Sequence, residues 1–97
     1  MKKQQVLDLL TQQFVDIRDR FGVERLALFG STARDEAQPD SDIDILVEFS
    51  GKADSKRYFG LLFYLEDQLG YPLDLVTDKA LRPELRPFIE QEAIYVP

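Results

Sequence analysis

The residues best suited to chemistry are two aspartates, Asp42 and Asp44, separated by a single residue. The apolar residues Ile43, Ile45 and Val47 alternate with them, as in a strand with one buried face. In a strand, residues two apart project from the same face, with Cα atoms about 7 Å apart. A slip of one residue would bury the charges in place of the apolar side chains. The pattern therefore predicts that both carboxylates lie on one face.

Two neighbouring carboxylates repel each other unless a positive charge neutralises them. Mg²⁺ suits such a pair, because it takes oxygen ligands and is commonly shared with nucleotide phosphates. Two such ions could stabilise both the attacking and the leaving oxygen of a transfer reaction. Asp74 is a third candidate, since Leu73 and Leu75 beside it must point to the opposite face of their strand. An acidic pair alone is weak evidence, because solvated sheet faces commonly carry one.

Gly30 and Ser31 supply supporting evidence, because they directly follow the apolar run of residues 25–29. Glycine permits close approach of the backbone, and a helix after it would offer amide groups and a positive dipole to a phosphate. Ser31 could equally be a plain helix cap. Arg34 lies one turn further on, where it could reach a phosphate or form a surface ion pair. Its acidic neighbours are Asp35, Glu36 and Asp40.

These residues need a scaffold, and the sequence predicts an alternation of helices and strands. A helical stripe of apolar residues recurs at intervals of three and four before Gly22, which ends the helix. The elements expected in the first half are a helix over roughly 4–20, strands over 25–29 and 42–49, a short helix over 31–37 and a turn over 38–41.

The second half continues the alternation after a polar loop. Gly70 is placed to end the next helix, and Pro83 and Pro87 mark the beginning of the last one. The elements expected are a loop over 50–54, a helix over 55–69, a strand over 73–76, a helix through about 92 and an edge strand over 94–96. We therefore predict a single α/β (α+β) domain over residues 1–97, with a small mixed β-sheet flanked by helices.

Composition narrows the chemistry further. The chain has 97 residues, of which 44% are hydrophobic and 31% charged, which predicts one globular domain. It contains neither cysteine nor histidine, so catalysis must rely on carboxylates, hydroxyls, Lys or Arg. A net charge of −6 argues against broad binding to nucleic-acid backbones. With no predicted signal or membrane-spanning segment, we expect a cytoplasmic protein that binds no membrane.

The motif as a whole resembles a known family. Gly30-Ser31, ten intervening residues and Asp42-Ile43-Asp44 are similar to the signature of the DNA polymerase β-like nucleotidyltransferases. The run Gly30-Ser31-Thr32-Ala33-Arg34 is similar to their minimal prokaryotic branch. The resemblance continues through residues 41–49, 73–76 and 92–96, and so covers nearly the whole chain.

The resemblance implies a role for each candidate. Asp42 and Asp44 would hold two Mg²⁺ ions, and Asp74 would complete the metal site and help to deprotonate an acceptor hydroxyl. Gly30 and Ser31 would bind the nucleotide phosphates, with Arg34 as a further contact. The reaction would be an in-line attack on the nucleotide α-phosphorus, with pyrophosphate leaving. One departure is Asp35, where many relatives carry glycine; we expect its side chain to point away from the metals.

The acceptor is predicted to come from a partner. Seven large apolar residues of the helix over 55–69 occupy more than one stripe, which indicates either a helix enclosed by the core or a partly exposed interface. In the minimal branch, the partner is a HEPN-domain ribonuclease toxin. The nucleotidyltransferase acts there as an antitoxin that transfers AMP from ATP to a tyrosine of the toxin. The apolar residues are Tyr58, Phe59, Leu61, Leu62, Phe63, Tyr64 and Leu65.

Two alternatives remain open at this point. The chain could be a binding-only antitoxin that blocks its partner sterically while the acidic site is idle, although the presence of all three aspartates disfavours this. It could also nucleotidylate a small molecule, as the related antibiotic-modifying transferases do. Those proteins resemble a longer chain with an added helical substrate domain, which this sequence lacks.

Overall fold

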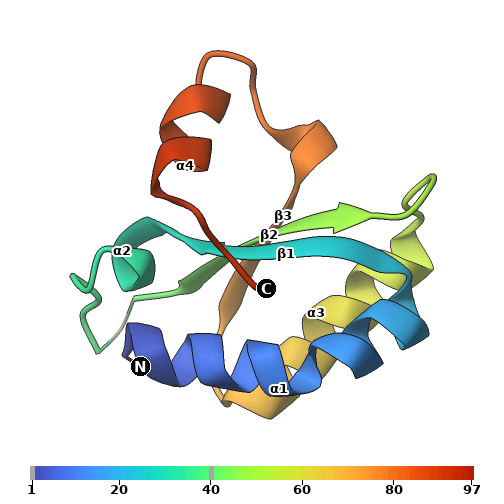
Figure 1. Ribbon diagram of the computed structural model, residues 1–97, viewed down its shortest axis with the longest axis horizontal. Coiled ribbons are helices and arrows are strands. Elements are labelled where there is room, and N and C mark those ends of the chain that lie inside the picture. Colours follow the sequence, from blue (N-terminus) through green and yellow to red (C-terminus); the bar gives the residue numbers. More distant parts are fainter. Residues whose placement is uncertain (1, 40) are drawn as a thin grey trace.

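The computed structural model describes residues 2–39 and 41–97 (Figure 1). Helices and strands alternate in the predicted order, with one additional 3₁₀ helix after the third strand. The elements are α1 (Lys3–Phe21), β1 (Val23–Phe29), α2 (Gly30–Ala33), β2 (Ile43–Phe49), α3 (Ser55–Leu69), β3 (Leu73–Thr77), η1 (Asp78–Ala80), α4 (Arg86–Glu92) and β4 (Ile94–Tyr95).

The four strands form one mixed sheet in the order β3-β2-β1-β4. β1 is antiparallel to both β2 and β4, whereas β2 and β3 run parallel. The register places Asp44 of β2 beside Phe29 of β1 on one side and beside Asp74 of β3 on the other. The predicted mixed sheet flanked by helices is therefore confirmed, and the strand that carries Asp44 is an inner strand.

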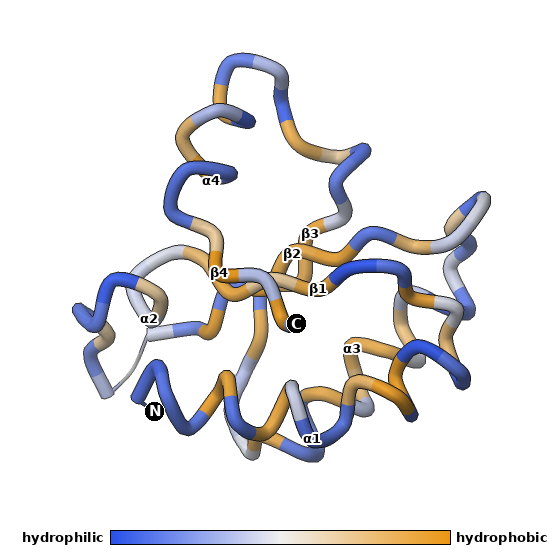
Figure 2. Tube along the Cα trace, in the orientation of Figure 1, coloured by the Kyte–Doolittle hydropathy of each residue, from blue (hydrophilic) through white to orange (hydrophobic). Residues whose placement is uncertain are grey.

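The two faces of the sheet are covered unequally. α1 and α3 lie together against one face, and α4 with the segment before it lies beyond the opposite face (Figure 1). Ile43, Ile45 and Val47 are buried on the face that α1 and α3 cover. The second face has a smaller cluster of buried residues, and α4 has a short hydrophobic stretch between hydrophilic ends (Figure 2). Its buried members are Ala27, Phe29 and Leu46.

Arg57 ties the two covering helices to the sheet. Its guanidinium donates hydrogen bonds to the carbonyl oxygens of Phe21 and Gly22, 2.9 and 2.6 Å away, at the end of α1. It also donates to the carbonyls of Ser50 and Lys52, in the loop after β2. The carbonyls of Phe21 and Gly22 have no partner within the helix α1. A cation at this end of the helix satisfies them and complements the helix dipole.

Some boundaries differ from those predicted. β1 begins at Val23, two residues earlier than expected, and β2 begins at Ile43, so that Asp42 lies just before the strand. The short helix expected over 31–37 is wrong in length, because α2 ends at Ala33. Asp35 has φ of 59°, a left-handed conformation that a continuing helix does not allow. Residue 40 of the predicted turn lies outside the described residues.

The helix α3 packs against the sheet and against α1, and leaves part of its apolar surface exposed. Leu61, Leu65 and Leu69 are buried against the sheet, whereas Phe59 and Phe63 are 49% and 63% exposed. The two phenyl rings stack with their centroids 6.2 Å apart. The part of α3 that exceeds one stripe therefore faces outward and is not enclosed by the core. None of the helices in the described part of the chain combines the length and apolar character needed to cross a membrane.

Candidate functional site

Asp44 and Asp74 form the centre of the candidate site. The parallel pairing of β2 and β3 makes them register partners, so their side chains leave neighbouring strands at the same level. Ile43 and Ile45 are buried on the opposite face, which directs the half-buried Asp44 away from the main core. Asp74 is exposed on the outermost strand. The structure thus brings together two of the three predicted acids through backbone pairing alone.

The electrostatics of this pair are those of crowded carboxylates. Burial, the negative charges of Asp74 and Asp42 and a hydrogen bond with Asp74 together raise the pKa of Asp44 to about 6. The positive charge of Arg34 acts in the opposite direction. Asp42, exposed just before β2, is therefore near enough to influence Asp44. Groups whose pKa is raised by both burial and like charge are typical of functional sites.

Gly30 connects these acids with residues 30–34, the segment that the sequence predicts to bind phosphates. It begins α2 with φ of 74°, a conformation that glycine adopts without strain. A Cβ atom at this position would overlap the carboxylate of Asp44. The close backbone approach that the sequence indicated is therefore an approach to Asp44. The amide of Gly30 donates to Oε1 of Glu92 at 3.1 Å.

Ser31 lies inside α2, which makes its interpretation as a helix cap wrong. The residue at the N-cap position is Phe29, and no side chain caps the helix there. α2 begins at Gly30 because the backbone turns sharply at the end of β1, one residue before the predicted start. Ser31 is half-buried and stays a candidate for phosphate binding.

Arg34 follows α2 and makes two ion pairs. Its Nε donates to Glu36 at 3.1 Å and its Nη1 donates to Glu92 at 2.8 Å. Of the surface partners predicted from the sequence, Glu36 is confirmed, while Asp35 contacts Lys3 at 3.7 Å instead. Asp40 lies outside the described residues. Hydrogen bonds with Glu92, and to a smaller extent with Glu36, raise the pKa of Arg34 and keep its side chain a cation.

Glu92 is the site residue that sequence reasoning missed. It ends α4, and the antiparallel pairing of β4 with β1 brings it next to Gly30, 62 residues earlier in the chain. Local periodicity says nothing about such a distant pairing. The only available signal was that the tail over residues 92–96 belongs to the resemblance.

The donor set fits a hard divalent cation. Asp44, Asp74 and Asp42 offer only carboxylate oxygens, which Mg²⁺ prefers, and Mg²⁺ usually takes one or two protein carboxylates together with substrate phosphates and water. Within residues 2–39 and 41–97, no three acidic side chains converge closely enough to surround an ion by themselves. Asp42, Asp44 and Asp74 would therefore be ligands only together with the nucleotide, which would supply further oxygens.

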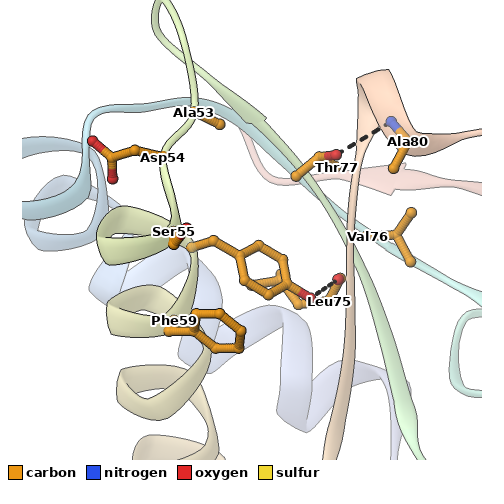
Figure 3. Close-up of a pocket in the computed structure, with 9 residues that line it drawn as sticks. Ala53, Asp54, Ser55, Phe59, Leu75, Val76, Thr77 and Ala80 are labelled. Atoms are coloured by element: carbon orange, nitrogen blue, oxygen red, sulfur yellow. Dashed lines mark hydrogen bonds between the residues drawn. The ribbon is translucent and has the colours of Figure 1, made fainter.

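A cavity of about 460 Å³ lies between the start of α3 and β3, and its lining includes none of the three aspartates of the candidate site (Figure 3). Tyr58 of α3 lines this cavity, and its hydroxyl donates to the carbonyl of Leu75 in β3 at 2.5 Å. Burial, and to a smaller extent the charge of Asp74, raises the pKa of Tyr58. The lining residues Leu75 and Val76 follow Asp74 directly in β3. The remaining lining residues are Ala53, Asp54, Ser55, Phe59, Thr77 and Ala80.

Comparison with known proteins defines the class. Residues 10–96 match the family model described as a nucleotidyltransferase domain. The chain is 40% identical over 93 residues to a candidate protein adenylyltransferase of Methanocaldococcus jannaschii, with 95% of each chain covered. It is 37% identical over 93 residues to the protein adenylyltransferase MntA of Thermococcus cleftensis, covering 96% of this chain and 94% of the relative. The chain therefore belongs to the nucleotidyltransferase domain family.

Solved structures agree with this assignment. A candidate minimal nucleotidyltransferase superposes with a TM-score of 0.83 at 35% identity, covering 97% of this chain and 95% of the other. A more distant antitoxin, solved in complex with a tri-AMPylated HEPN toxin of Shewanella oneidensis, gives a TM-score of 0.67 at 19% identity, with 94% and 71% covered. At that identity the second likeness concerns the fold alone. The predicted fold of a minimal nucleotidyltransferase is confirmed.

Proposed function

We propose that this chain is a Mg²⁺-dependent protein adenylyltransferase that transfers AMP from ATP to a hydroxyl group of a partner protein. The observation that carries the proposal is the pairing of Asp44 with Asp74 across two parallel strands, with Gly30 packed against Asp44. This arrangement sets two carboxylates beside a segment suited to phosphates. Relatives of nearly the same length that are named as protein adenylyltransferases support the choice of nucleotide and acceptor class.

Each residue of the site has a part in the proposed transfer. Gly30, Ser31 and Arg34 would bind the phosphates of ATP, while Asp42, Asp44 and Asp74 would hold Mg²⁺. When bound, Mg²⁺ neutralises the carboxylates and the charge that develops on the phosphates.

The bond changes are those of a single displacement. The acceptor oxygen forms a bond to the α-phosphorus, the bond from that phosphorus to the bridging oxygen breaks, and pyrophosphate leaves with the electron pair. Asp74 would receive the acceptor proton, and its exposure at the sheet edge supports this role. The cavity beside β3 supports an acceptor that approaches from that edge.

We further propose that the partner is a HEPN-domain toxin, that its acceptor is a tyrosine and that modification neutralises it. The family resemblance of the motif supports this, as does the fold shared with an antitoxin solved in complex with an AMPylated HEPN toxin. The outward-facing rings of Phe59 and Phe63 give α3 an apolar surface that a protein partner could cover. A small-molecule acceptor has less support, because the relatives that the chain matches over nearly their full length are named as protein adenylyltransferases.

The test combines the protein, Mg²⁺, ATP and the product of the neighbouring gene, followed by intact mass spectrometry of both proteins. We expect the partner to gain the mass of one or more AMP groups and to lose its ribonuclease activity. A partner that is inhibited without gaining mass would establish steric blocking instead. ATP replaced by GTP, CTP or UTP serves as the control for nucleotide preference.

A further inference from the structure

Glu92 bridges two parts of the phosphate-binding segment. One carboxylate oxygen accepts from the amide of Gly30 at 3.1 Å, and the other accepts from Nη1 of Arg34 at 2.8 Å. The Glu92 side chain is 29% exposed, so these bonds are shielded more than a typical surface ion pair. A bidentate carboxylate that accepts from a backbone amide and a guanidinium at once fixes both donors relative to each other.

The same bridge also sets the position of the segment relative to the acids. Gly30 has no room for even a Cβ atom, because its Cα faces the carboxylate of Asp44. Any displacement of the Gly30 backbone would therefore alter the space around Asp44. Glu92 thus restrains three components of the site through two hydrogen bonds: the Gly30 backbone, the Arg34 guanidinium and, through Gly30, the surroundings of Asp44.

The bridge leaves Arg34 able to bind an anion. A guanidinium has five N–H donors, and Glu92 uses one of the two on Nη1. Glu36, whose side chain is 65% exposed, accepts from Nε, and within the described residues no group accepts from Nη2. Displacing the exposed Glu36 would free the edge formed by Nε and Nη2. That edge is the two-donor fork that binds phosphate oxygens in pairs.

We propose that Glu92 is a positioning residue of the nucleotide site: it fixes the turn at Gly30 and the guanidinium of Arg34, so that Ser31 and the remaining donors of Arg34 receive the phosphates of ATP. The proposal rests on the function proposed above, because it concerns the same nucleotide. Glu36, by contrast, is a displaceable surface partner of the same arginine. The two glutamates therefore form a matched pair: both contact Arg34, but only Glu92 also holds Gly30.

The experiment measures the affinity of the full chain for a non-hydrolysable ATP analogue with Mg²⁺ by calorimetry. Glu92→Gln removes the charge and keeps the side-chain size, and we expect it to weaken binding about tenfold. Glu36→Gln should leave the affinity unchanged or raise it. Combining Glu92→Gln with Arg34→Ala should weaken binding little beyond Arg34→Ala alone, because the two residues act as one unit. Thermal unfolding of each variant reports separately on stability.

The outcomes separate the inference from the function on which it rests. If the unchanged protein binds no nucleotide, both are overturned. If it binds, but Glu92→Gln binds equally well or more tightly, Glu92 is a purely structural residue or one that nucleotide displaces, and the inference alone fails. An equal loss with Glu36→Gln would also overturn it. Should Glu92→Gln not fold, Glu92→Asp keeps the charge but shortens the reach, and the same loss of affinity is expected.

Discussion

The Cα of Gly30 lies so close to the carboxylate of Asp44 that any residue with a Cβ atom at position 30 would overlap this carboxylate. This contact joins the end of β1 to the start of β2, two strands that are also antiparallel neighbours. The packing of the protein itself therefore requires glycine at position 30, independently of any bound nucleotide.

Gly30→Ala tests that requirement, with Gly51→Ala as its matched control. Both glycines have positive φ, 74° and 69°, so each substitution carries backbone strain of about 1 kcal/mol. A Cβ at position 51 meets nothing within 4 Å, whereas one at position 30 collides with Asp44. We expect Gly51→Ala to lower only the unfolding midpoint, and Gly30→Ala to reduce AMP transfer at least tenfold as well, a loss of about 1.4 kcal/mol of transition-state stabilisation. Equal transfer by the two variants would contradict this.

Replacing two of the acids tests the chemistry directly. Asp42→Asn combined with Asp44→Asn should abolish AMP transfer, measured by intact mass, because neutral amides hold Mg²⁺ poorly. The fold should persist, since removing crowded charges relieves repulsion. The control is Asp16→Asn combined with Asp67→Asn, which changes the net charge equally at exposed positions on α1 and α3. Transfer that survives the first change, or is lost with the second, would exclude the proposed site.

The raised pKa of Asp44 predicts a dependence of stability on pH. Its pKa is about 6 in the folded protein, against 3.8 as its ordinary value, so the folded state binds this proton more tightly than the unfolded state. Ionising Asp44 therefore destabilises the fold progressively as pH rises from about 4 to about 6, after which the effect is constant. Asp44→Asn should raise the unfolding midpoint near pH 7 without divalent cations and have little effect near pH 3.5. If Asp44→Asn raised the unfolding midpoint near pH 3.5 but not near pH 7, this prediction would be refuted.

The effect of Mg²⁺ on the unfolding midpoint gives a second prediction. Near pH 7 it should raise the unfolding midpoint of the unchanged protein, because an ion that binds only the folded state stabilises it. Asp44→Asn should show a much smaller rise. Asp67→Asn, an exposed change on α3, should respond as the unchanged protein does.

Replacing Arg57 tests the stability of the fold separately from the proposed reaction. Its guanidinium donates to four backbone carbonyls and lies 4.9 Å from the centroid of the Phe49 ring. Arg57→Met should lower the free energy of unfolding by about 2 to 4 kcal/mol in denaturant titrations, since several acceptors lose their partner. Arg57→Lys should recover only part, because an ammonium lacks the planar fork. Nucleotide affinity of the folded fraction should not change, and a selective loss of affinity would show that Arg57 acts on the site.

The contrast between predicted and missed features has a physical basis. The face shared by Ile43, Ile45 and Val47 follows from a period of two in the sequence, so the orientation of Asp44 was predictable. The apolar neighbours Leu73 and Leu75 made Asp74 a candidate, and the strand register explains why it lies beside Asp44. The length of α2 was mispredicted because Asp35 adopts a conformation that glycine normally takes, and its residue type does not announce this.

The contact between Glu92 and Gly30 also determines the order in which the protein can become functional. Gly30 and the three aspartates are all made before Glu92, which lies 62 residues after Gly30. While the ribosome is still adding the residues of α4, the acids exist but Arg34 lacks its stronger partner. Closing so long a loop has an entropic cost that local helix formation does not. The proposed nucleotide site is therefore completed only after α1 and α3, the helices that cover the other face, have been made.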